Sequence, residues 1–258
     1  MVKKPLKSEF KFGSAATAPR YARGIILGDS GSGKTTLGAT APKPLLVVNI
    51  DRGIASLPRD PNIFIYPDPA EGRPVKSWTE LKDFISFCEN GGLDDIETIM
   101  FDSITEAGEL LKEHILGQAG PTKRVHNRVL SQADYGLFGT FMLDLIRRIV
   151  ELPANVVLTA QPRDDMVDKP EGGKVVWRMP DFGHGQMTAP KAIPLMDFQG
   201  VLEVEVKDKQ LVRKLILQPI NNRKGKIRTK PGVTAPVSID RPDLMEVFKL
   251  IAGDEKGE

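Results

Sequence analysis

The stretch ILGDSGSGKTTLG, residues 26–38, contains the spacing Gly28-x-x-x-x-Gly33-Lys34-Thr35. Its first residues complete the short apolar run RGIIL, and the residues after the lysine begin a helical pattern. A loop with this spacing between a strand and a helix directs its backbone N–H groups at an anion. The stretch therefore predicts that the first strand–loop–helix unit binds the phosphate groups of a nucleoside triphosphate.

Each part of this loop has an expected role in binding ATP and Mg²⁺. Lys34 reaches the β- and γ-phosphates, Thr35 offers its hydroxyl to Mg²⁺, and Thr36 contacts the α-phosphate. The alternative is a glycine-rich turn that binds nothing. The residues expected to hold the nucleotide are Gly28, Ser30, Gly31, Ser32, Gly33, Lys34, Thr35 and Thr36.

Beyond the loop, apolar strands alternate with amphipathic helices. This alternation favours an α/β fold in which helices flank a mainly parallel sheet, and ligands of such sheets bind beyond the carboxyl ends of the strands. Further strands are expected at PLLVVNI (44–50), NIFIYP (62–67), TIMF (98–101) and ANVVLTAQ (154–161). Helices are expected after Ser77 and over residues 105–117, 135–152 and 241–251.

The composition and periodicity of the sequence change after residue 161. Residues 162–195 are rich in Gly, Pro and charge, which predicts a long loop with a short hairpin. VLEVEV (201–206) and QLVRKLILQP (210–219) alternate like a C-terminal antiparallel hairpin. The expected organisation is a basic segment over residues 1–20, an ATPase core over 21–252 and a flexible tail over 253–258.

Three strands end in polar residues that suit a triphosphate site. Four apolar residues that end in Asp102 form a Walker B strand, whose carboxylate is expected on the Mg²⁺ side; the alternative is that Asp102 caps the next helix. Asp51 closes the second strand and is expected to orient water, or else to start a turn. Gln161 is expected to sense the γ-phosphate, or else to cap its strand. The candidate catalytic residues are Lys34, Asp51, Asp102 and Gln161.

Composition limits the class of protein. The 258 residues carry a net charge of only +2, so general attraction to nucleic acid does not follow, although residues 3–23, 121–128 and 221–230 are locally basic. Cys88 is the only cysteine, which excludes an intramolecular disulfide and a Cys-rich metal site. No window approaches the roughly 18 apolar residues of a membrane span, and the basic start lacks an apolar signal region. We expect a cytoplasmic protein with no membrane partner.

The stretches GDSGSGKTTLGAT, PLLVVNIDRGIASL, ETIMFDSITEAGELL, SQADYGLFGTFMLDLI and NVVLTAQPRDD, in this order, resemble RecA-type recombination ATPases. The closest resemblance is to the phage-encoded single-strand annealing recombinases of the Sak family that consist of a RecA-like core, and it covers residues 23–228. It implies DNA-dependent ATP hydrolysis, ATP and Mg²⁺ as cofactors, and the cytoplasm of a bacterial host. It also implies single-stranded DNA as partner, head-to-tail self-association into a filament or ring, and a single-strand-binding protein as a further candidate partner.

The resemblance also implies roles for particular residues. Asp51 matches the catalytic carboxylate, which is usually Glu, and Gln161 matches the glutamine that couples the γ-phosphate to a DNA-binding loop. Two DNA-binding loops correspond to residues 118–133 and 163–188, where a mobile surface lid is the alternative. The expected DNA contacts are Lys123, Arg124, Arg128, Arg163, Lys174, Trp177 and Arg178. The expected cations that act on a neighbouring subunit's nucleotide are Arg223, Lys224, Lys226 and Arg228.

The leading hypothesis is an ATPase that assembles on single-stranded DNA and promotes annealing or homologous recombination. A P-loop phosphotransferase such as a kinase is an alternative, although no acceptor-binding pattern is visible. A second alternative is a DNA-binding or loader protein that ATP switches without significant turnover. Fold alone does not separate these classes.

Overall fold

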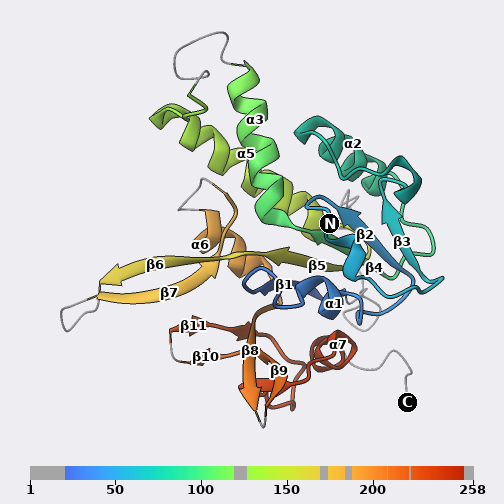
Figure 1. Ribbon diagram of the computed structural model, residues 1–258, viewed down its shortest axis with the longest axis vertical. Coiled ribbons are helices and arrows are strands. Elements are labelled where there is room, and N and C mark those ends of the chain that lie inside the picture. Colours follow the sequence, from blue (N-terminus) through green and yellow to red (C-terminus); the bar gives the residue numbers. More distant parts are fainter. Residues whose placement is uncertain are drawn as a thin grey trace, which may run out of the picture.

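The computed structural model describes residues 21–118, 127–168, 174–183, 188–207, 209–220 and 222–252. Its main sheet has the strand order β13-β9-β8-β1-β5-β4-β2-β3, with β12 paired to β8 (Figure 1). These strands are β1 (Arg23–Leu27), β2 (Leu45–Asn49), β3 (Ile63–Tyr66), β4 (Thr98–Asp102), β5 (Asn155–Ala160), β8 (Phe198–Lys207), β9 (Gln210–Ile216), β12 (Lys226–Ile227) and β13 (Ser238–Asp240).

Helices cover both faces of this sheet (Figure 1). They are α1 (Lys34–Gly38), α2 (Trp78–Glu89), α3 (Ile104–Gln118), α5 (Gln132–Val150), α6 (Thr188–Ala192) and α7 (Leu244–Ala252), with 3₁₀ turns η1 (Gly53–Ser56), η2 (Pro69–Glu71) and η3 (Ile193–Leu195). Apolar side chains of α2, α3 and α5 form one core cluster with the sheet, and those of α1 and α7 form a second. The expected α/β fold with a mainly parallel, helix-flanked sheet is confirmed.

The strand order brings the expected site residues to one edge. β1, which leads into the phosphate loop, is parallel to β5, and β5 is parallel to β4. β4 is in turn parallel to β2, with Asp102 opposite Asn49. Since the carboxyl ends of parallel strands share an edge, the residues after β1, β2, β4 and β5 lie close together.

Two expectations from the sequence were incomplete. The helix expected over 135–152 begins earlier, at Gln132, because Ser131 caps it in a reciprocal pair with Asp134: Asp134 N donates to Ser131 Oγ and Ser131 N donates to Asp134 Oδ2. Capping lies outside the apolar periodicity that suggested the helix, so periodicity alone missed the first turn.

The expectation of a long loop with a short hairpin over 162–195 was the second: the hairpin is present, and it takes up more of the stretch than expected. β6 (Pro162–Asp168) and β7 (Lys174–Pro180) form a regular antiparallel hairpin, called the arm below, and α6 follows. The arm projects from the main sheet (Figure 1) and forms a second sheet of order β10-β11-β7-β6, with β10 (Pro219–Ile220) and β11 (Arg223–Lys224). The many charged residues of β6 obscured how far the hairpin extends.

The C-terminal antiparallel hairpin is confirmed. β8 pairs with β9 from Val201 to Lys207, and its earlier residues run parallel to β1. The hairpin is thereby part of the main sheet and continues past the end of β1. None of the described helices has the length and apolar character needed to cross a membrane.

Candidate active site

The phosphate loop joins β1 to α1. Gly33, the N-cap of α1, has a φ of 97°, a left-handed conformation that glycine adopts without strain. The N–H of Gly28 donates to the carbonyl of Ala160 at 3.3 Å, and that of Ser32 donates to Asp29 at 3.1 Å. These bonds hold the loop at the shared edge of β1 and β5.

The other predicted loop residues divide by exposure. Ser30 and Gly31 are exposed within the loop, and Thr36 is exposed in the first turn of α1. Ser32 is 5% exposed, and its hydroxyl has no hydrogen-bond partner among the described residues. A buried hydroxyl without a partner beside the loop is a donor that a phosphate oxygen can satisfy.

The side chain of Lys34 crosses the loop. Its Nζ donates to the carbonyls of Gly28 at 2.7 Å and Asp29 at 3.1 Å. Burial lowers the pKa of Lys34, whereas the negative charges of Asp102, Asp51 and Asp29 raise it. The ammonium group is therefore partly desolvated and surrounded by acceptors.

Asp102 is fixed by hydroxyl groups from two elements. Thr35 Oγ1 donates to Asp102 Oδ2 at 2.6 Å, and the buried Thr159 hydroxyl donates to Oδ1. The N-cap position of α3 is taken by Ser103, whose Oγ accepts from Glu106 N at 3.4 Å. The carboxylate of Asp102 thus faces the phosphate loop and does not cap the following helix.

Asp51 lies beside Asp102. The backbone N–H of Asp51 donates to the carbonyl of Asp102 at 3.1 Å, and its carboxylate accepts from Gly53 N at 3.0 Å. Burial and the adjacent charge of Asp102 raise the pKa of Asp51, against hydrogen bonds from Gly53 and Ser103 and the charge of Lys34. The two carboxylates are thus close enough to repel each other.

Oxygen atoms from three elements surround one point next to η1. A Cβ atom at Gly53 would lie 2.9 Å from Asp51 Oδ1, 3.0 Å from Asp102 Oδ2 and 3.2 Å from Thr35 Oγ1. The point is open because residue 53 has no side chain. Oxygen ligands suit Mg²⁺, which usually binds through one or two carboxylates together with substrate phosphates.

Thr35 and Asp102 therefore fit the expected Mg²⁺ ion. Within the described ranges, no group of three or more His, Cys, Asp or Glu side chains is placed to hold a metal. A site that depends on phosphate oxygens for its remaining ligands agrees with this donor set.

Gln161 lies at the root of the arm. Its N–H donates to Thr105 Oγ1 at 3.0 Å, and this hydroxyl donates to the carbonyl of Asp181 at 2.6 Å. The N–H of Asp181 donates back to Gln161 O at 2.9 Å. These bonds join the ends of β5 and β7 to the start of α3, so Gln161 stands where the arm leaves the main sheet.

The arginines of the arm are paired with carboxylates. Arg178 Nη1 lies 3.4 Å from Asp29 Oδ2 of the phosphate loop, and its Nε lies 3.8 Å from Asp164 Oδ1. Arg163 Nε lies 2.9 Å from Asp165 Oδ1. The predicted DNA contact Arg178 therefore faces the phosphate loop.

The remaining predicted DNA contacts divide into two groups. Arg128 pairs with Glu113 of α3 at 2.6 Å. Lys123 and Arg124, and the side chain of Lys174, lie outside the part of the chain that the structure describes.

The second sheet unites residues that the sequence assigned to different roles. Lys224 Nζ lies 5.7 Å from the ring centroid of Trp177, within the range of a cation–π contact. Arg223 is opposite Arg178 in the parallel pairing of β11 with β7, and its Nε donates to Glu203 Oε1 at 2.5 Å. An aromatic ring and two of the four expected trans-acting cations thus belong to this second sheet.

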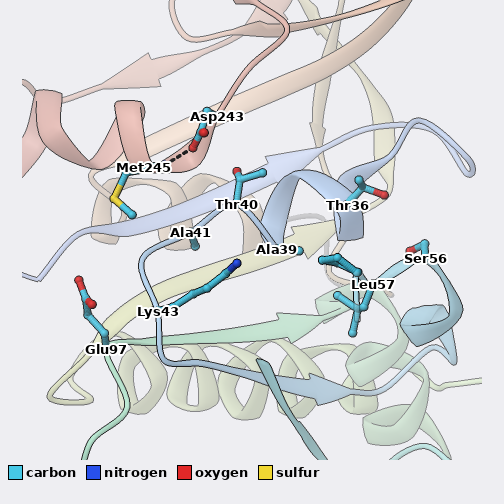
Figure 2. A pocket seen from close by; sticks show the side chains of 11 residues that line it. Thr36, Ala39, Thr40, Ala41, Lys43, Ser56, Leu57, Glu97, Asp243 and Met245 are labelled. Carbon is cyan, nitrogen blue, oxygen red and sulfur yellow. Dashed lines mark hydrogen bonds between the residues drawn. The ribbon is translucent and has the colours of Figure 1, made fainter. Parts of the chain in front are cut away.

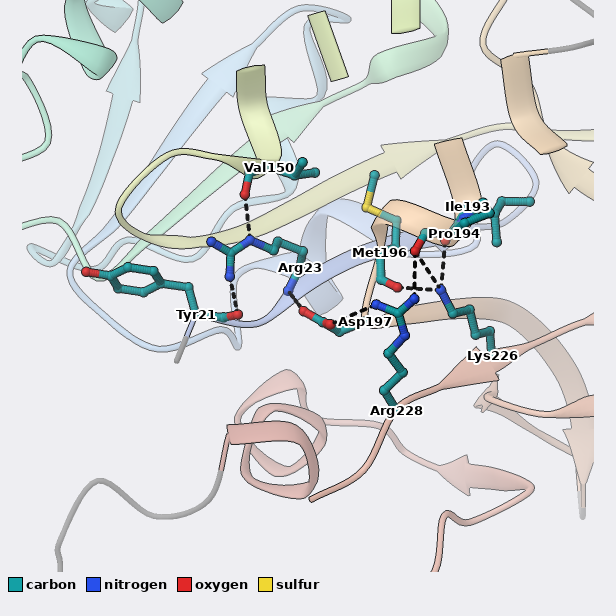
Figure 3. A network of polar contacts seen from close by, with 9 residues as sticks. All are labelled: Tyr21, Arg23, Val150, Ile193, Pro194, Met196, Asp197, Lys226 and Arg228. Atoms are coloured by element: carbon teal, nitrogen blue, oxygen red, sulfur yellow. Dashed lines mark hydrogen bonds and ion pairs between the residues drawn. The ribbon is translucent and has the colours of Figure 1, made fainter. Parts of the chain in front are cut away.

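The other two expected trans-acting cations, Lys226 and Arg228, stabilise η3 (Figure 3). Lys226 Nζ donates to the carbonyls of Ile193 at 2.9 Å and Met196 at 2.5 Å, and Arg228 lies 3.6 Å from Asp197. Asp197 in turn accepts from the N–H of Arg23. Because Arg23 begins β1 and the phosphate loop follows its end, both cations lie at the opposite edge of the sheet within one chain.

A cavity of about 700 Å³ opens beside α1 (Figure 2). Thr36 and Thr40 line it from α1 and the turn after it, Leu57 and Pro58 line it from the segment after η1, and Asp243 lines it from the start of α7. Its lining residue Thr36 directly follows the expected Mg²⁺ ligand Thr35 in the sequence. Its lining combines the apolar residues Leu57, Pro58 and Met245 with the charged residues Lys43, Glu97 and Asp243.

Sequence reasoning missed three residues of this site. Thr159 is a buried polar residue within an apolar strand, and that contrast was the available signal. Nothing in the sequence around Gly53, apart from its position two residues after Asp51, indicates a role in the site. Arg213 of β9, whose Nε donates to the carbonyl of Ser32 at 2.9 Å, alternates like any exposed strand residue.

Comparison with known proteins shows the family of this chain. The family model described as an AAA domain matches residues 20–229, which is most of the chain. No curated protein matches the sequence.

Solved structures to which this chain is similar include the following three. A prototypical ATPase from the type III secretion system of pathogenic bacteria is 17% identical, with a TM-score of 0.43, over 71% of this chain and 52% of that chain. A KaiC-like protein from the archaeon Pyrococcus horikoshii is 12% identical (TM-score 0.34; 81% and 84% covered). The flagellar accessory protein FlaH from Methanocaldococcus jannaschii is 13% identical, with a TM-score of 0.39, over 86% of this chain and 85% of that chain. The chain spans about half the length of the secretion ATPase.

Proposed function

Because the chain belongs to the family of AAA domains, we propose that it binds ATP with Mg²⁺ at the loop between β1 and α1 and hydrolyses the γ-phosphate. It is a P-loop ATPase of RecA-like fold. The observation that carries the proposal is the convergence of Thr35, Asp102 and Asp51 on the open point at Gly53. A loop that binds phosphate, a metal-side carboxylate and a second carboxylate are the parts that hydrolysis requires.

Each residue then has a defined task. Lys34 and the loop N–H groups bind the β- and γ-phosphates, and Thr35 with Asp102 holds Mg²⁺. When bound, Mg²⁺ neutralises charge on the phosphate oxygens. Asp51 accepts a hydrogen bond from the attacking water and thereby orients it toward phosphorus. The raised pKa of Asp51 suits a carboxylate that takes up a proton during the reaction.

The nucleoside occupies the cavity of Figure 2. Thr36 is both the expected α-phosphate contact and part of the cavity wall. Leu57 and Pro58 are the apolar side chains that this cavity offers to a base, and the cavity extends from Thr36 as far as Lys43 and Glu97, which precede β2 and β4. The cavity volume is within the range of ligand sites of nucleotide size.

The work done by ATP is the binding and annealing of single-stranded DNA. Two observations support this beyond the sequence resemblance to RecA-type recombinases. The arm presents a half-buried Trp177 beside Lys224, a combination that stacks a base and attracts its phosphate. The arm also begins at Gln161 and touches the loop through Arg178, so a change at the γ-phosphate can reach it.

The test is steady-state phosphate release from Mg²⁺-ATP, with and without a single-stranded oligonucleotide, at two salt concentrations. Stimulation by DNA that weakens at higher salt supports the proposal. ATP-dependent DNA binding without turnover would instead establish a nucleotide switch. Transfer of phosphate to a small acceptor would establish a phosphotransferase, and either result would overturn the proposed reaction.

A further inference from the structure

The β8–β9 hairpin extends beside the phosphate loop. β1 ends at Leu27, opposite Val201, whereas β8 continues to Lys207. The carbonyl oxygen of Leu202 lies only 3.0 Å from the position of a Cβ atom at Gly28. The part of the hairpin beyond Val201 therefore packs against the loop from outside.

Arg213 is the side chain through which β9 contacts the loop. It is opposite Val204 in the β8–β9 pairing, and its Nε donates to the carbonyl of Ser32 at 2.9 Å. The backbone of Arg213 is held as well, because its own carbonyl accepts from the N–H of Arg241 at 2.8 Å. With β9 paired to strands on both sides, the guanidinium group is mounted on a rigid element.

The absence of a side chain at Gly33 permits this contact. A Cβ atom there would lie 2.5 Å from Arg213 Nε, closer than any real carbon contact. The φ of 97° at Gly33 also favours glycine. Gly33 thus has two roles: its positive φ permits the turn of the loop, and its lack of a side chain leaves room for Arg213.

The contact fixes the orientation of one peptide group. In a trans peptide the C=O and the next N–H point in opposite directions within one plane. Arg213 holds the Ser32 carbonyl outward, so the N–H of Gly33 points inward, toward the expected position of the β-phosphate. A charged donor on the carbonyl also polarises the peptide and strengthens its N–H as a donor.

We propose that Arg213 is a positioning residue that sets the Gly33 N–H for the β-phosphate and so couples the β8–β9 hairpin to nucleotide affinity. This rests on the proposed function, because it requires a nucleotide in the loop. The β-phosphate is common to ATP and ADP. The contact therefore affects both affinities alike and leaves the hydrolytic step to Asp51.

The terminal nitrogens of Arg213 allow a competing role to be tested. They make no hydrogen bond or ion pair to any residue that the structure describes. Arg213 lines a cavity of about 230 Å³ together with Thr36 and Arg241. A guanidinium group that acted on the γ-phosphate would distinguish ATP from ADP. One that orients Gly33 does not.

The experiment measures the dissociation constants of ATP and ADP for the wild-type chain and for Arg213→Ala, Arg213→Lys and Lys214→Ala. Lys214 is the neighbouring cation on β9 and serves as the matched control. We expect R213A to weaken ATP and ADP binding about tenfold each, R213K to recover part of the loss, and K214A to bind as the wild type does. In R213A, kcat at saturating ATP stays close to the wild-type value. The amide resonance of Gly33 shifts on ADP binding in the wild type and shifts less in R213A.

The outcomes separate the two proposals. A wild-type chain that binds neither nucleotide contradicts the proposed function itself. Binding by the wild type with unchanged affinities in R213A overturns the role of Arg213, as does a loss confined to ATP. A lower Tm in R213A with unchanged ADP affinity would reduce Arg213 to a stabilising contact and would also overturn it.

Discussion

The hydroxyl of Thr35 donates a 2.6 Å hydrogen bond to Asp102, across 67 residues of sequence. It joins the start of α1 to the end of β4 and marks the side of the loop where Mg²⁺ is expected. We predict that Thr35→Ala lowers Mg²⁺-dependent ATP turnover at least about a hundredfold, because one ligand and the partner of Asp102 are lost together. Thr35→Ser keeps the hydroxyl and should retain most of the turnover, and a serine variant as inactive as the alanine variant would contradict the role.

The proximity of Asp51 to Asp102 predicts that replacing Asp51 stabilises the folded chain and lowers ATP turnover. Burial and the charge of Asp102 raise the pKa of Asp51, so its ionised form costs folding free energy at neutral pH. Asp51→Asn removes that cost. We expect the Tm of the nucleotide-free variant to be slightly higher than that of the wild type at pH 8, while kcat falls about a hundredfold or more.

The sign of this effect depends on pH. A carboxyl whose pKa is raised by folding destabilises the chain above that pKa and ceases to do so as pH falls below it. The gain in Tm of D51N should therefore shrink between pH 8 and pH 4 in thermal melts. A gain that grows toward acid would contradict the assignment.

The pH profile of turnover offers a further prediction. Asp51 orients water only when ionised, and in the nucleotide-free chain burial and the charge of Asp102 raise its pKa, which moves the acid limb of kcat/KM above the range of an ordinary aspartate. We expect kcat/KM to fall as pH is lowered through that limb. The residual turnover of D51N should lack the limb, and a limb of the same shape in both proteins would assign it to another group.

Lys226 distinguishes a structural role from a trans-acting one. Its Nζ donates to the carbonyls of Ile193 and Met196 and extends to that of Pro194. We predict that Lys226→Ala lowers the free energy of unfolding by about 2 kcal/mol, whereas the exposed Lys191→Ala on α6 leaves it unchanged. Lower ATP turnover in K226A at unchanged stability would instead support the trans role.

The arm gives the prediction on DNA. If Trp177 stacks a base, Trp177→Ala should weaken binding of single-stranded DNA by about 1–3 kcal/mol. Phe87→Ala, which removes an aromatic side chain that is 59% exposed on α2, is the matched control and should bind as the wild type does. Equal affinities in both variants, measured by fluorescence anisotropy at fixed salt, would remove Trp177 from the DNA site.

Local patterns predicted the parts of the fold that depend on near neighbours. The phosphate loop and the parallel strands follow from apolar runs and from glycine spacing, and both match the structure. Asp51 and Asp102 were both expected at the triphosphate site because each follows or ends an apolar strand. The parallel register of β2 with β4 brings them together, and no local pattern predicts that strand order.

Contacts between distant segments were not predictable in the same way. Arg213 contacts Ser32 because the β8–β9 hairpin extends beyond the end of β1. The relative lengths of strands that are far apart in sequence cannot be predicted from a local pattern. Lys224 meets Trp177 because β11 adds to the arm. The four basic residues at 223–228 look alike in sequence, yet two join the arm and two bind η3, since the chain crosses from one sheet to the other between them.

The most direct test of the account is phosphate release from ATP by the wild-type chain and by Lys34→Ala, at equal protein concentration, with Mg²⁺ and with a chelator in its place. The account predicts release by the wild type only when Mg²⁺ is present, and none above background from K34A. Equal release by the two proteins, or release by the wild type that does not need Mg²⁺, would contradict a hydrolytic site at the loop between β1 and α1.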